Sequence, residues 1–123
     1  MTGEIILKLI EIQNQFRILH WQTFGDAKHR AYGDVYSDLD SIIDGFAETM
    51  MGKYGRPEFG SDFSINLKDI SAISLQSFID ESVDFLVSMT DKLDSRYDTD
   101  LLNIRDEMMG LLNKLKYLLT LKS

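Results

Sequence analysis

The sequence predicts an all-α fold in which four helices form a bundle of two antiparallel hairpins. Four segments repeat apolar residues at steps of three and four, the spacing that places side chains on one face of a helix. The chain also holds a single proline, Pro57, so that long helices are not interrupted. Its 123 residues correspond to one domain and are enough to bury a sizeable core. We therefore expect residues 1–123 to form one domain.

The first two predicted helices form one hairpin. The first runs from about Glu4 to Thr23, and the second runs from about Ala27 to Met51. Residues 24–26 form the short turn that makes these helices antiparallel neighbours. The apolar stripe of the first helix consists of Ile5, Leu9, Ile12, Phe16 and Leu19. The stripe of the second helix consists of Val35, Leu39, Ile42, Phe46 and Met50.

The other two predicted helices form the second hairpin. The third runs from about Ser74 to Leu93, and the fourth begins at Asp98 or Thr99, either of which can cap a helix. The apolar stripe of the third helix consists of Leu75, Ile79, Leu86, Met89 and Leu93. The fourth directs inward Leu101, Ile104, Met108, Leu111, Leu115 and Leu118.

A long crossover, residues 52–72, separates the two hairpins. It contains Gly52, Gly55, Pro57 and Gly60, which break helices, and residues 65–70 are expected to form a short extra helix. Two hairpins joined by one long crossover is the topology of ferritin-like bundles. We therefore expect a ferritin-like four-helix bundle.

The composition excludes several classes of function. A net charge of −7 argues against binding to nucleic acids or anionic membranes, which requires clustered Lys and Arg. No apolar stretch approaches the roughly 20 residues that span a bilayer, and the N-terminal residues do not resemble a secretory signal. We therefore expect a cytoplasmic protein. The chain has no cysteine, so a metal site would use His, Asp, Glu or Met.

Four residues are candidates for metal binding. The only two histidines, His20 and His29, flank the first turn, and the second helix carries Asp44 and Glu48. Acids four residues apart lie on one helix face and can chelate a hard cation together. In an acidic protein, however, such a pair usually marks a solvated face, and a lone histidine is usually structural.

Helix geometry prevents these four residues from binding one metal within one chain. His29 and Asp44 are separated by a rise of roughly 22 Å along the second helix. Asp44 and Glu48 also point away from the apolar stripe, whereas the metal site of a ferritin bundle faces inward. Two alternatives remain. The acids face water, or the second helix packs antiparallel on its own copy, which places His29 near Asp44 of the partner subunit.

The segment His20-Trp21-Gln22-x-x-Gly25, at the end of the first helix, resembles the His-Trp-Asn-x-x-Gly signature of Dps, the DNA-starvation protection proteins. The second-helix pattern of the family is followed without a gap by His29, Tyr32, Tyr36, Leu39, Asp40, Asp44, Ala47 and Glu48. Residues 98–102 resemble the opening of the fourth helix of the family. The resemblance is best over residues 16–48.

The resemblance implies a ferroxidase site shared between subunits. Its ligands and catalytic residues would be His20 and His29 of one subunit with Asp44 and Glu48 of the partner subunit. Iron(II), bound singly or in pairs, would be oxidised by peroxide or oxygen, for iron sequestration or protection from oxidative stress. Manganese or zinc also suits this ligand set. The protein would form a homodimer or a higher oligomer through the second helix.

Departures from the Dps pattern support an alternative. The family has an acid at the position of Gly33, and here Asp34 follows it, about 100° further round the helix. The alternative is a non-catalytic bundle that acts as a protein-interaction module. Trp21 either lies beside a metal pocket or packs at the helix end. Tyr32 and Tyr36 either line a two-fold interface or pack within the bundle.

Overall fold

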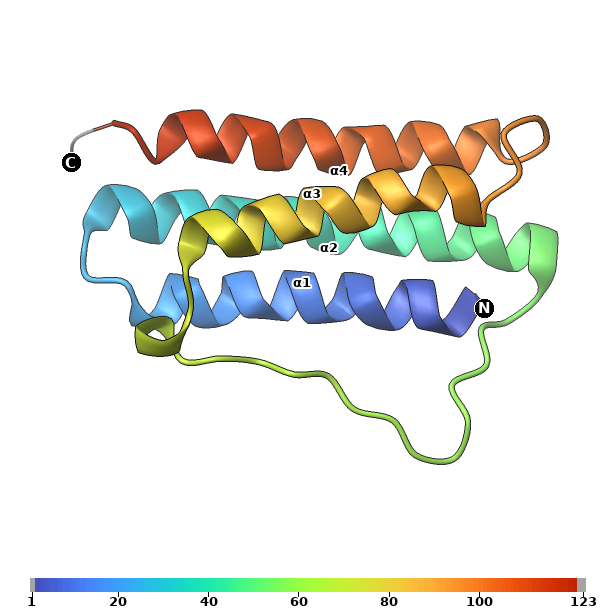
Figure 1. The fold of residues 1–123 in the computed structure, drawn as a ribbon, viewed down its shortest axis with the longest axis horizontal. Coiled ribbons are helices and arrows are strands. Elements are labelled where there is room, and N and C mark those ends of the chain that lie inside the picture. The colour runs from blue at the N-terminus through green and yellow to red at the C-terminus, as the bar shows by residue number, and fades with distance from the viewer. Residues whose placement is uncertain (1, 122–123) are drawn as a thin grey trace.

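The computed structural model describes residues 2–121, and these form four α-helices (Figure 1). In chain order these are α1 (Thr2–Gln22), α2 (Asp26–Tyr54), α3 (Leu75–Lys92) and α4 (Thr99–Leu118). A short 3₁₀ helix, η1 (Ile70–Ala72), precedes α3, and residues 2–121 contain no strand. None of these helices is both long and apolar enough to cross a lipid bilayer. The prediction of an all-α chain with four helices is confirmed.

The four helices lie side by side, with short connections between α1 and α2 and between α3 and α4 (Figure 1). The crossover leaves the C-terminal end of α2, runs along the outside of α1 and returns to η1 at the other end of the molecule (Figure 1). The closest helix pairs are α1 with α2, α2 with α4, and α3 with α4. In contrast, the backbones of α1 and α3 approach each other closely at few positions, so a seam remains between them.

The core is one continuous cluster of side chains from all four helices. Phe16 is fully buried near its centre, with its ring centroid 6.4 Å from that of Tyr32 and 5.0 Å from that of Phe78. The predicted stripe of α1 is confirmed, since all five of its residues are buried. On α2 the buried residue is Ile43 rather than Ile42, which packs only partly against the core.

The core position expected for Ile104 is held by Arg105, which is 8% exposed. Its Nη1 donates to the carbonyl of Leu86 at 2.8 Å and to the hydroxyl of Thr90 at 3.0 Å, both on α3. Its Nε donates to Asp106 at 2.8 Å. Burying a charged group is tolerated where it is paired and hydrogen-bonded. Arg105 therefore ties α4 to α3, whereas Ile104 is only partly buried.

The crossover is extended where a helix over residues 65–70 was expected, and that expectation is wrong. Side chains of α1 accept the amide hydrogens of alternate crossover residues, at 2.7–2.8 Å. The bonds join Glu11 to Asn66, Gln15 to Lys68, and Gln22 to Ile70. Alternate residues of an extended chain point the same way, which suits anchors along one helix face. We call residues 66–70 the strap.

Replacing Gln15 with alanine should release the middle of the strap. Gln15 is 3% exposed, and its Nε2 also donates to the Lys68 carbonyl at 2.9 Å, so that two hydrogen bonds are lost together. We expect the free energy of unfolding to fall by about 2 kcal/mol and the Lys68 amide to exchange its hydrogen faster. Gln13→Ala is the control, because Gln13 is also buried but bonds to Asp40 on α2. Equal exchange at Lys68 in both variants would contradict this role.

Candidate functional site

The two histidines lie against each other across the first turn. His20 comes from the last turn of α1 and His29 from the first turn of α2. Their rings are stacked, with centroids 3.9 Å apart and planes inclined by 18°. The Nδ1 of each ring lies 2.7 Å from the backbone oxygen of the other histidine. Because a carbonyl only accepts, each Nδ1 carries a proton, which leaves Nε2 as the ring atom of each histidine that can ligate a metal.

Gly33 makes room for the His20 ring on α2. A Cβ atom at this position would lie 2.7 Å from Cε1 of His20 and 2.8 Å from Nδ1, closer than real Cβ contacts. A glycine inside a helix costs roughly 1 kcal/mol relative to alanine. The space for the His20 ring is therefore obtained at the expense of α2 stability. Asp34, the next residue, is exposed and lines a separate pocket together with Lys114 of α4.

The acidic pair lies far from the histidines of the same chain. Asp44 and Glu48 are both exposed on α2, as the helical period predicted. Within residues 2–121, no group of three or more His, Asp or Glu side chains is gathered closely enough to hold a metal. One chain therefore brings His20 and His29 together and leaves the two carboxylates further along α2.

Exposed aromatic side chains surround the turn. Trp21 is 65% exposed and Phe24 is completely exposed, so neither packs into the end of the bundle. The Arg17 guanidinium lies 5.7 Å from the Trp21 ring and 4.3 Å from the Tyr36 ring, within the range of cation–π attraction. Tyr32 is 2% exposed in the core, so of its two alternatives the structure supports packing within the bundle.

A second polar cluster lies at the opposite end of the bundle. Asp98 is 1% exposed, and its carboxylate accepts the Tyr54 hydroxyl proton, with the hydroxyl oxygen 2.7 and 2.6 Å from its two oxygens. It also accepts the Asp94 amide hydrogen at 2.9 Å. The Lys53 ammonium lies 3.5 Å from its carboxylate. Although Asp98 immediately precedes α4, its side chain makes no capping hydrogen bond. No sequence motif indicated this cluster, because Tyr54 and Asp98 are 44 residues apart.

The pKa values of the cluster reflect these contacts. Burial raises the pKa of Asp98, but the hydrogen bonds from Tyr54 and the Asp94 amide, together with Lys53, outweigh it, and the pKa is lowered overall. The hydrogen bond to Asp98, with burial and the nearby carboxylates, raises the pKa of Tyr54 to about 12. The cluster therefore favours a charged Asp98 and a neutral Tyr54, which together join α2 to the connection between α3 and α4.

Comparisons with known proteins overturn the expected family. The chain is 25% identical over 121 residues to an uncharacterized 14.6 kDa protein from the mobD-ri intergenic region of Enterobacteria phage T4, covering 98% of this chain and 89% of that protein. No solved structure matches the chain. A family of unknown function, DUF5856, matches residues 20–119, and the assignment to Dps is therefore wrong. Since the match extends over most of the length of this chain, the chain belongs to the family DUF5856.

Proposed function

We propose that this protein binds iron(II) between two copies of the chain and oxidises it. The ligands are His20 and His29 of one subunit with Asp44 and Glu48 of the partner subunit. The stacked histidine pair carries the proposal. A histidine that ligates a metal almost always donates its other ring N–H to a carbonyl or carboxylate, as both rings do here. Two imidazoles with two carboxylates suit iron, and also manganese or zinc.

A second copy supplies what one chain lacks. Two α2 helices packed antiparallel across a two-fold axis place the first turn of each near the later turns of the other. Such an interface repeats every contact, so it forms two equivalent sites. The exposure of Asp44 and Glu48 supports the arrangement, because it leaves this face of α2 free to meet a second copy. The net charge of −7 favours the approach of cations.

In the proposed reaction, iron is the substrate. Two iron(II) ions each lose one electron to one hydrogen peroxide molecule, which takes up two protons and leaves as two water molecules. The neutral histidines supply nitrogen donors whose direction is fixed by the paired carbonyls. The carboxylates offset the larger charge of iron(III). The consequence for the cell is iron sequestration or protection from oxidative damage.

The proposal is tested by adding iron(II) without oxygen, then peroxide, and following the formation of iron(III). Asp44→Ala should abolish the fast oxidation and leave the helix content unchanged, because Asp44 is exposed. Asp38→Ala is the matched control, since it removes another exposed acid of α2 that is not a proposed ligand. Fast oxidation retained in Asp44→Ala, or lost equally in both variants, would contradict the assignment.

A protein-interaction module is the second candidate. Trp21 and Phe24 are large aromatic side chains exposed at one end of the molecule, and such residues are enriched in protein interfaces. This candidate requires no metal. It predicts no saturable iron binding and the same unfolding temperature with and without a chelator, whereas a metal-binding dimer is stabilised by its metal.

A further inference from the structure

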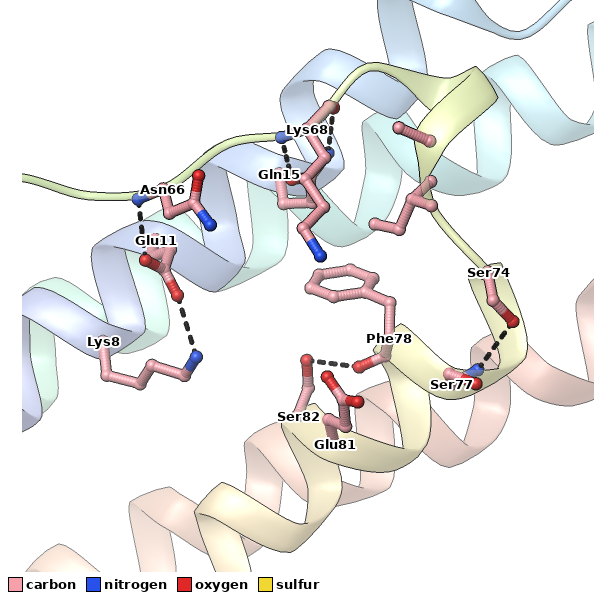
Figure 2. Close-up of a pocket in the computed structure, with 12 residues that line it drawn as sticks. Lys8, Glu11, Gln15, Asn66, Lys68, Ser74, Ser77, Phe78, Glu81 and Ser82 are labelled. Atoms are coloured by element: carbon pink, nitrogen blue, oxygen red, sulfur yellow. Dashed lines mark hydrogen bonds and ion pairs between the residues drawn. The ribbon is translucent and has the colours of Figure 1, made fainter.

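A polar cleft lies in the seam between α1 and α3, beneath the strap (Figure 2). Its volume is about 340 Å³, at the small end of the range for ligand pockets. It is lined by residues of α1, the strap and the first half of α3. The Phe78 ring forms part of its wall and is itself supported by the buried Phe16, whose centroid is 5.0 Å away. The cleft lies where the backbones of α1 and α3 stay apart, beside the contact between Phe16 and Phe78.

Two of the four charged groups in the cleft neutralise each other. The Lys8 ammonium lies 2.8 Å from one oxygen of Glu11, and the other oxygen of Glu11 accepts the Asn66 amide hydrogen. The remaining pair are Lys68 on the strap and Glu81 on α3, and neither forms an ion pair within residues 2–121. Figure 2 shows both charged groups directed into the cleft from different walls. The cleft therefore offers one positive and one negative group to a ligand.

Buried contacts hold these walls in place. The backbone of Lys68 is fixed at both its amide and its carbonyl by the buried Gln15. On α3, Ser82 is 2% exposed, and its hydroxyl donates to the Phe78 carbonyl at 2.8 Å. Ser74 and Ser77 add two more hydroxyls to the lining. The backbone that carries the two charged side chains is therefore preorganised, which lowers the entropic cost of binding a ligand.

We infer that this cleft binds a small zwitterion, a molecule with one carboxylate and one ammonium group joined by a short chain. The carboxylate pairs with the Lys68 ammonium and the ammonium with the Glu81 carboxylate. The connecting chain lies against the Phe78 ring. A purely anionic or purely cationic ligand would leave one of the two protein charges unpaired and would meet repulsion from it.

The test is a titration with ω-amino acids of increasing length, from β-alanine to ε-aminocaproate, in the presence of a chelator that removes metals. We expect saturable changes in the amide NMR signals of Ser77, Phe78 and Glu81 with at least one member of the series. The N-acetyl derivative and the methyl ester of that compound, which each lack one charge, should bind about tenfold more weakly or worse. The absence of saturable changes with the whole series, or equal binding of the derivatives, would overturn the inference.

Two variants test the charged groups individually. Lys68→Gln and Glu81→Gln should each weaken binding about tenfold or more. Lys68→Gln leaves the strap attached, because Gln15 holds only the backbone of residue 68. Lys114→Gln and Glu107→Gln are the controls, since both residues are exposed on α4 and lie outside the cleft. Binding that is unaffected by the two cleft variants, or reduced equally by the controls, would overturn the inference.

Discussion

Asp98→Ala should lower the free energy of unfolding by about 3 kcal/mol, because it removes a buried carboxylate together with the charge-assisted hydrogen bonds that it accepts. The Tyr54 hydroxyl, the Asp94 amide and the Lys53 ammonium all bond or pair with the Asp98 carboxylate. Without that carboxylate these interactions are lost, and the three groups form hydrogen bonds with water at the end of the bundle instead. The expected result is a lower midpoint in urea unfolding with little change in helix content.

Two further variants show whether burial causes the effect. Asp100→Ala removes a side chain that also pairs with Lys53, at 3.0 Å, but is 52% exposed. An exposed ion pair contributes little, so this change should cost much less than Asp98→Ala. Asp98→Asn keeps the size of the side chain and an acceptor oxygen, and should therefore cost less than Asp98→Ala. Equal losses for Asp98→Ala and Asp100→Ala would show that the Asp98 contacts do not stabilise the fold.

The same cluster predicts the pH dependence of stability. The folded state lowers the pKa of Asp98, so its contribution is present above its unfolded pKa, near 4, and is lost as the pH falls through its lower folded value. The folded state raises the pKa of Tyr54 to about 12, so its contribution is complete below its unfolded value, near 10, and is lost as the pH rises through about 12. In Asp98→Asn, the loss of stability in acid should be smaller than in the wild type.

Gly33→Ala should disrupt the histidine pair and leave the bundle folded. The new Cβ would meet the His20 ring at 2.7–2.8 Å, so the ring must leave its place against α2 and give up its bond to the His29 carbonyl. Loss of such a supporting bond typically lowers metal affinity by roughly 10–100-fold. We expect a drop of this size in iron(II) affinity, together with a shift of the imidazole NMR signals of His20.

Gly45→Ala is the matched control for this change. Gly45 lies on the same helix, but nothing lies within 4 Å of the position that its Cβ would take. Alanine there should stabilise α2 by up to about 1 kcal/mol without affecting the histidines. Gly33→Ala could instead raise the stability and leave iron binding unchanged, as expected for Gly45→Ala. That result would show that the space which Gly33 leaves for the His20 ring plays no part in the site.

The sequence predicted the helices well because the spacing of apolar residues is a local signal. The same reasoning searched for apolar residues and therefore chose Ile104 over the buried Arg105, and on α2 it chose Ile42 over its neighbour Ile43. It also expected a helix over residues 65–70. Nothing within that segment shows that its backbone amides donate hydrogen bonds to side chains of α1, which lie more than 40 positions earlier in the chain.

Part of the candidate site could be predicted and part could not. The short turn placed His20 near His29, and the helical period placed Asp44 outward. The role of Gly33 was hidden, because it depends on how the His20 ring is oriented in three dimensions. The family was misjudged for a related reason. A few polar residues at fixed spacings along two helices are compatible with more than one lineage of helical bundles.

The anchoring of the strap has a consequence for evolutionary drift. Gln15 forms hydrogen bonds only with the backbone of Lys68. The side chains of Glu11 and Gln22 likewise accept hydrogen bonds from the backbone amides of Asn66 and Ile70. Most substitutions in the strap therefore leave its attachment intact, apart from proline at an anchored position. Ahead of the strap, an insertion would lengthen a surface loop at an entropic cost of only about 0.6 kcal/mol per doubling. Related chains can thus diverge in the identity and length of this segment, and reshape the cleft beneath it, while keeping the same four helices.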